Sequence, residues 1–126
     1  TEIYTLSLHD ALPISLHPLE HKRVPFITKQ LAGSEGPVIA ATDYLRAYAD
    51  QVRAFIPGDF VVLGTDGYGR SDTRAQLRQF FEVNAHYVVI ATLKALSDRG
   101  EVPAQVVADA IARYGIDADK PAPWTV

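Results

Sequence analysis

The sequence predicts an α/β domain in which a partly parallel sheet is flanked by helices. Two short apolar runs, residues 36–41 and 60–64, have the length and composition of buried strands. The segment between them carries apolar side chains at helical spacing. The order strand, helix, strand indicates a βαβ unit with parallel strands and a right-handed crossover.

Composition narrows the class of protein. A chain of 126 residues with 48% hydrophobic side chains fits one domain with a core of its own. The net charge of -3 and the scattered Lys and Arg residues argue against a nucleic-acid partner. The chain has no cysteine, which excludes a disulfide scaffold. No apolar stretch reaches the roughly 18 residues of a membrane span, and no basic signal region opens the chain. A cytoplasmic protein without a membrane partner is compatible with these features.

Residues 1–15 do not fit the pattern of the remaining chain. They show no sustained hydrophobic periodicity, and their amino-acid sequence resembles a translated sequencing adapter. We therefore interpret residues 1–15 as a non-native segment that contributes nothing to the core, with an ordinary amphipathic segment as the alternative. The domain is predicted over residues 16–120. A polar, proline-rich tail over residues 121–126 is expected to run over the surface.

The first half of the domain is predicted to hold two helices. One is expected within residues 22–33, where a glycine provides a stop. The other is expected over residues 42–56, with Thr42 or Asp43 placed to cap its start and Pro57 to end it. Its apolar face is formed by residues at helical spacing, namely Leu45, Tyr48, Ala49, Val52, Phe55 and Ile56.

Three further helices are predicted in the second half. The first places three large apolar side chains on one side, Leu77, Phe80 and Phe81. The second covers residues 84–100; its segment YVVIA could form a strand, but the cap residue Asn84 and the stop at Gly100 favour a helix. The third covers residues 103–115, and Gly115 occupies the position of a left-handed C′ residue.

The motif GTDGYGRSD, residues 64–72, lies between a predicted strand and a predicted helix. It differs by one letter from the phosphate-binding pattern G-x-x-x-x-G-K-S/T, because arginine replaces the lysine. Its two aspartates would also face the phosphates. We favour a structural turn in which glycines 67 and 69 permit the bend and Ser71 or Asp72 caps the helix. A phosphate site and a loop that meets another chain through Arg70 remain alternatives. The residues of this structural loop and cap are Gly64, Asp66, Gly67, Gly69, Arg70, Ser71 and Asp72.

Other candidate residues for chemistry are few. His17 and His21 are four residues apart, but an intervening proline makes a shared helical face for a metal unfavourable. His86 is interpreted as a packing residue, and His9 lies in the segment set aside. No serine stands in a nucleophile-elbow motif, and no spacing marks a pair of carboxylates as acid and base. We therefore expect no catalytic, cofactor-binding or metal-binding residue in this chain.

Four stretches carry a resemblance to a known family: LHPLE with RVPFI, ATDYLRAYADQVRAFIP, VLGTDGYGRSDTRAQLRQFFEV and VVADAIARYGIDADK. Over about Leu16 to Lys120 the chain resembles the C-terminal end of the E1 component of the pyruvate dehydrogenase complex, in its homodimeric bacterial form. The resemblance implies a three-layer, transketolase C-terminal-like domain. That domain begins in the family with a further strand and helix, so the resemblance also implies an N-terminally truncated copy.

The same resemblance implies a function for the parent protein. The family decarboxylates pyruvate with thiamine diphosphate and magnesium, and then acetylates the lipoyl group of the E2 component. Its cofactor-binding residues belong to the other two domains, and none maps onto this sequence. The resemblance therefore implies a structural, dimer-supporting domain whose partners are the rest of the E1 chain, a second E1 subunit and the E2 acetyltransferase. A stand-alone α/β interaction module without catalysis is the alternative.

Overall fold

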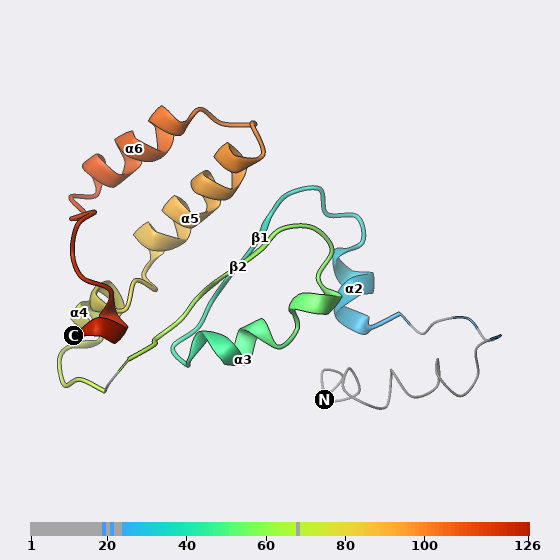
Figure 1. Cartoon of the computed structure of the whole chain (residues 1–126), viewed down its shortest axis with the longest axis horizontal. Helices are drawn as coiled ribbons and strands as arrows, with labels where there is room; N and C mark the ends of the chain where they lie inside the picture. Colours follow the sequence, from blue (N-terminus) through green and yellow to red (C-terminus); the bar gives the residue numbers. More distant parts are fainter. Residues whose placement is uncertain (1–18, 20, 22–23, 68) are drawn as a thin grey trace.

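The computed structural model describes residues 19, 21, 24–67 and 69–126 (Figure 1). Residues 1–18, which include the residues interpreted as non-native and His17, lie outside this range, so the predictions made for them stay predictions. In chain order the elements are α2 (Phe26–Leu31), β1 (Val38–Ala41), α3 (Arg46–Asp50), the 3₁₀ helix η2 (Arg53–Phe55), β2 (Phe60–Leu63), α4 (Arg74–Phe80), α5 (Ala85–Asp98), α6 (Ala104–Arg113) and the 3₁₀ helix η3 (Pro123–Thr125).

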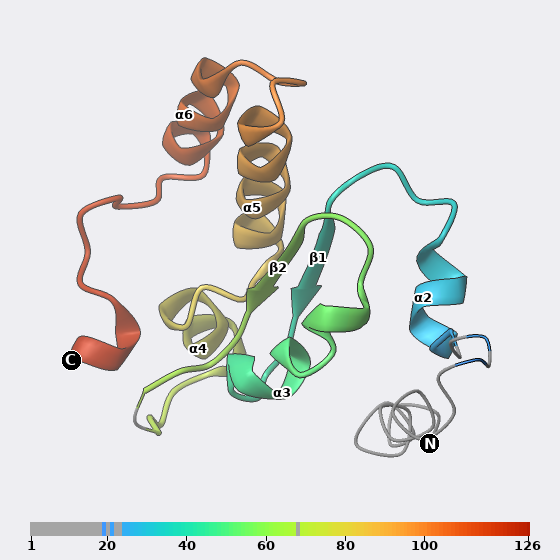
Figure 2. The same ribbon diagram turned by 45° about the vertical axis from the view of Figure 1, so that its right-hand side comes forward.

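The two strands form a parallel pair, as the βαβ pattern predicts. Val38 is opposite Phe60, and Ala41 is opposite Leu63. Phe60 and Val62 are buried on one face of β2 and form the core with Ile56, against apolar side chains from α2, β1 and α3. Helix α5 contacts both strands, and α6 packs on α5 (Figure 2). The predicted α/β domain with a parallel sheet flanked by helices is therefore confirmed.

The predicted helix over residues 42–56 is shorter and interrupted. Only Arg46–Asp50 is α-helical, and Arg53–Phe55 forms a 3₁₀ turn. The interrupted segment is bonded to its neighbours on both sides. The Phe55 carbonyl accepts a hydrogen bond from the Thr28 hydroxyl of α2, and the Arg53 Nη1 donates to the Phe60 carbonyl at 2.7 Å. The first bond ties the end of η2 to α2, and the second ties Arg53 to β2.

The caps expected at Thr42 or Asp43 for this helix are also wrong. The Thr42 hydroxyl accepts from the Tyr44 N–H at 3.1 Å, which closes a turn before the helix begins. Leu45 occupies the N-cap position and contributes no side-chain bond. The first helical N–H, that of Arg46, is instead bound by a side chain from a distant loop, which is described below.

The three later helices are confirmed, with the stop signals that the sequence predicts. The Asn84 side chain accepts from the Tyr87 N–H at 3.1 Å and caps α5, which contains the segment YVVIA. Gly100 and Gly115 have positive φ values of 78° and 64° after α5 and α6. Helix α4 ends in the same way, but its left-handed residue is Glu82, with φ 63°. Within the described part of the chain, no helix has both the length and the apolar character required to cross a bilayer.

The C-terminal tail is packed more closely than predicted. It was expected to run over the surface, but Pro123 at the start of η3 is buried. In Figure 1 the tail leaves α6 and returns toward α4, on the side of the molecule where the loop after β2 lies. The C-terminal segment therefore covers part of the loop that carries the motif GTDGYGRSD.

Candidate functional site

The glycine-rich loop joins the end of β2 at Leu63 to the start of α4 at Arg74 and is hydrogen-bonded to the start of α3. The Thr65 N–H donates to the Tyr44 carbonyl at 2.9 Å. The Thr65 hydroxyl donates to the Asp43 carbonyl at 2.5 Å. The βαβ arrangement brings these segments together, because the loop and the start of α3 both follow the carboxyl ends of neighbouring parallel strands.

Asp66 is the best-connected side chain of the loop. One carboxylate oxygen accepts from the Arg46 backbone N–H at 3.1 Å, and the other pairs with the Arg46 guanidinium. The carboxylate therefore binds both the first N–H and the first side chain of α3, where the helix dipole also favours a negative charge. Partial burial alone would raise the pKa of Asp66, but the hydrogen bonds and the charge of Arg46 outweigh it and lower the pKa.

Two of the three loop glycines are required by the local geometry. A Cβ atom at Gly64 would lie 2.7 Å from the backbone nitrogen of Arg46. Gly67 has φ +116°, and a Cβ atom there would lie 2.9 Å from the Pro123 carbonyl oxygen. By contrast, a Cβ atom at Gly69 would meet nothing within 4 Å. The positive φ of Gly67 is consistent with the predicted turn, whereas Gly69 has neither a positive φ nor a close neighbour.

The helix after the loop is capped by Thr73, which corrects the prediction of Ser71 or Asp72. The Thr73 hydroxyl accepts from the Gln76 N–H at 3.3 Å. Asp72 accepts from the Thr73 N–H at 2.7 Å, one residue before the helix. The sequence contains a signal for this cap, since Thr73 and Gln76 have the spacing of a capping box. The prediction placed the cap at Ser71 or Asp72, just before this threonine.

Replacing Thr73 with alanine should lower the free energy of unfolding by about 1 kcal/mol, the usual effect of losing a side-chain N-cap. The Gln76 N–H then has no side-chain acceptor at the start of α4. Urea unfolding followed by circular dichroism measures the change. Asp72→Ala is the matched control and should have the smaller effect, because Asp72 bonds only the N–H that precedes the helix. A larger loss in Asp72→Ala would contradict this assignment.

Arg70, in the loop before α4, lies against that helix. Its guanidinium carbon is 4.4 Å from the centre of the Phe80 ring, a cation–π contact. Arg70 also lines a cavity of about 470 Å³ beside the loop. The other residues around this cavity come from the loop, α4 and the start of α3: Asp43, Thr65, Gly67, Gly69, Asp72, Arg74, Leu77, Arg78 and Phe81.

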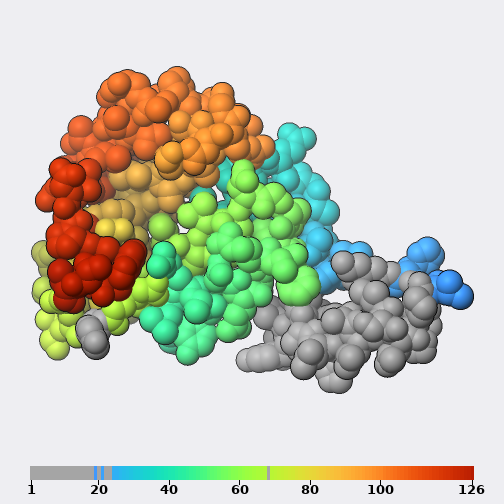
Figure 3. Space-filling view, in the orientation of Figure 1, coloured from blue at the N-terminus to red at the C-terminus, as the bar shows by residue number. Residues whose placement is uncertain are grey.

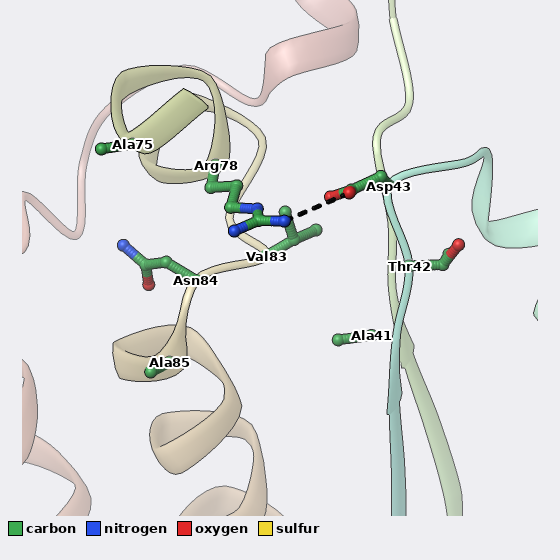
Figure 4. A pocket seen from close by; sticks show the side chains of 8 residues that line it. All are labelled: Ala41, Thr42, Asp43, Ala75, Arg78, Val83, Asn84 and Ala85. Atoms are coloured by element: carbon green, nitrogen blue, oxygen red, sulfur yellow. Dashed lines mark hydrogen bonds and ion pairs between the residues drawn. The ribbon is translucent and has the colours of Figure 1, made fainter. Parts of the chain in front are cut away.

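A second cavity, of about 500 Å³, lies between α4 and the end of β1 (Figure 4). Asp43 and Arg78 point toward each other across it and form an ion pair at 3.4 Å. The side chains around them include the apolar Ala41 and Val83 and the polar Asn84. Both side chains of this pair are exposed to solvent. Such a surface ion pair contributes little to stability.

The histidines within the described residues are not grouped. His86 lies at the exposed start of α5, and its ring stacks on Tyr114 of α6 with centroids 4.2 Å apart. The interpretation of His86 as a packing residue is consistent with this contact. His21 is exposed. Among residues 24–67 and 69–126, no three His, Cys, Asp or Glu side chains lie close enough to hold a metal ion.

The described part of the loop also does not suit a diphosphate with magnesium. Asp66, one of the two loop carboxylates, is paired with Arg46. Two N–H groups at the start of α4, those of Thr73 and Gln76, are bound by side chains of the same segment. The donor groups that a phosphate-binding loop would present are therefore partly used within the chain.

The pH dependence of stability tests the contact between Asp66 and Arg46. Because the fold lowers the pKa of Asp66, the carboxylate stabilises the protein above its ordinary pKa of 3.8, and this contribution is lost as the pH falls through the lower pKa. Asp66→Asn should therefore be less stable than the parent near neutral pH, and the difference should disappear in acid. Unfolding measured across this range checks the result. A difference that does not change with pH would contradict the ionic contact.

This fold and loop are those of a recognised domain class. Residues 13–84, more than half of the chain, match the family described as the transketolase-like TK C-terminal domain. The chain therefore belongs to that family. The match includes residues 13–15, the last three of the segment interpreted as non-native, and the boundary at residue 15 stays a prediction.

The curated relatives have one name in common, pyruvate dehydrogenase E1 component. The relative from Escherichia coli (strain K12) is 55% identical over 106 residues, which is 83% of this chain and 12% of the relative. The relative from Haemophilus influenzae is 54% identical over 114 residues, 89% of this chain and 13% of the relative. The relative from Cupriavidus necator is 53% identical over 111 residues. The chain is similar to the C-terminal region of these proteins and spans about one eighth of their length.

Proposed function

We propose that this chain is the C-terminal, structural part of a pyruvate dehydrogenase E1 component. The single observation that carries the proposal is the identity of 53–55% over most of the chain to the C-terminal region of such proteins. The parent protein would decarboxylate pyruvate with thiamine diphosphate and magnesium and acetylate the lipoyl group of an E2 acetyltransferase. Its partners would be a second E1 subunit and E2, in the cytoplasm.

Within that protein the segment acts by packing and not by chemistry. The loop that resembles a phosphate-binding motif directs its carboxylate Asp66 to Arg46 and its arginine Arg70 to Phe80. The two contacts connect β2 to α3 and to α4. This supports a structural role for the loop, which positions two helices of a domain that braces the dimer. The thiamine site then belongs to the preceding domains.

The test uses the full-length protein, a variant that ends before this segment, and this chain alone. Full-length protein with thiamine diphosphate and magnesium should reduce a dye in the presence of pyruvate. The chain alone should give no turnover, and the shortened variant should lose dimerisation and activity together. Turnover by the chain alone, or an active dimeric shortened variant, would refute the structural role. A full-length protein without any pyruvate turnover would instead favour a non-catalytic interaction module.

A further inference from the structure

Large apolar side chains are exposed just before α3, on α3 and on η3. Tyr44 is 71% exposed and Tyr48 is 62% exposed, and their rings meet edge to face at 5.9 Å. Leu45, between them in sequence, is 47% exposed. Trp124 of η3 is 52% exposed. Figure 3 shows α3 and the C-terminal segment on the same face of the molecule. We call Tyr44, Leu45, Tyr48 and Trp124 the aromatic face.

The segment that carries Tyr44, Leu45 and Tyr48 is held by contacts from the glycine-rich loop and from η3. The Tyr44 carbonyl accepts from the Thr65 N–H at 2.9 Å, and Asp66 holds the first residue of α3. The guanidinium of that residue, Arg46, lies 4.9 Å from the centre of the Trp124 ring. The aromatic side chains are therefore presented by an ordered frame. Ordered presentation lowers the entropy cost of binding, and Tyr and Trp are enriched at the centres of interfaces.

The area of the face distinguishes two kinds of partner. With aromatic side chains of 150–250 Å² each, its exposed fractions correspond to roughly 450 Å² of surface. A stable interface between separate proteins buries about 800 Å² on each partner, so this face alone is too small for a dimer. It does suit a contact between domains of one chain, where the whole interface can be as small as about 600 Å².

We propose that the aromatic face packs against the preceding part of the same E1 chain. This inference rests on the proposed function. The relatives devote about seven eighths of their length to residues outside this segment, so the partner surface is covalently attached. Covalent attachment raises the effective concentration of the partner surface, so even a small contact can be stable. In the full-length protein the contact would place α3 and the loop next to the preceding domains.

The test is a photo-crosslink in the full-length protein. Tyr48 is replaced with p-benzoylphenylalanine, and a mixture of ¹⁵N-labelled and unlabelled subunits is irradiated and digested. We expect crosslinked peptides that join α3 to the preceding part of the chain with both halves carrying the same label. Crosslinks only between differently labelled subunits, crosslinks only to E2, or no crosslink would overturn the proposal. Pyruvate turnover of the unmodified full-length protein reports separately on the proposed function.

A paired substitution gives an independent measure. Tyr44→Ser with Tyr48→Ser should increase the rate of limited proteolysis ahead of this segment about tenfold, since cleavage follows the population of the opened state. Val89→Ser with Val106→Ser is the matched control, because those side chains are also partly exposed, at 39% and 40%, but lie on α5 and α6. An equal increase in both variants, or none in the tyrosine variant, would overturn the proposal.

Discussion

Gly64→Ala is expected to lower the free energy of unfolding by roughly 1–3 kcal/mol, the range seen when extra atoms are forced into a packed site. The new methyl group would lie 2.7 Å from the Arg46 nitrogen and 2.9 Å from its Cα atom. These are backbone atoms, so they cannot move aside by rotating a side chain. Displacing Arg46 would also disturb its hydrogen bond to Asp66 and hence the start of α3. Chemical denaturation followed by tryptophan fluorescence measures the change.

Gly69→Ala is the control for this prediction, because it makes the same chemical change in the same loop. A Cβ atom at Gly69 meets nothing within 4 Å. We expect its stability to remain within about 0.5 kcal/mol of the parent, as for other surface substitutions. Similar losses in both variants would show that the close approach of Gly64 to Arg46 is not what restricts the loop.

Phe60→Ala is expected to lower the free energy of unfolding by about 3–5 kcal/mol, the usual cost of removing a buried aromatic ring. Phe60 is 8% exposed and forms the core with Ile56 and Val62. Its ring also lies 5.2 Å from the Arg53 guanidinium carbon, so η2 would lose a contact with β2. The effect should be large relative to total stability, because the described core contains few buried side chains. Thermal and urea unfolding both measure it.

Tyr44→Ala provides the comparison for Phe60→Ala, since it removes an aromatic ring that is 71% exposed. In this chain it should change stability by less than about 1 kcal/mol, as expected away from the core. If Phe60→Ala cost no more than Tyr44→Ala, the core would have to lie elsewhere than between β2 and the helices α2 and α3.

The sequence predicts those elements that are determined by local signals. Helix α5 follows from its length, its cap at Asn84 and its stop at Gly100, although YVVIA alone favours a strand. The parallel strands follow from the βαβ order. The broken helix at α3 could not be predicted, because its apolar spacing continues to Ile56, whereas the tertiary bond from Thr28 to the Phe55 carbonyl has no signal in the local sequence.

The candidate loop also combines features that the local sequence predicts with contacts that it does not. The glycine at position 67 can be predicted to permit a turn, since a left-handed backbone favours that residue. The bond from Asp66 to Arg46 spans twenty residues, and no local pattern indicates it. The approach of Pro123 to Gly67 spans still more of the chain. Contacts of this kind depend on the tertiary arrangement, whereas the missed Thr73 cap was available as a short-range motif.

The position of α6 has a consequence for how the domain opens. Helix α6 packs on α5, and Tyr114, which follows α6, stacks on His86 of α5. We therefore expect α6 to detach while the sheet remains intact, as a separate cooperative unit with a lower opening energy. In hydrogen exchange, the amides of α6 should be replaced by deuterium at a common rate, faster than those of β1 and β2. The domain would thus lose its structure in stages.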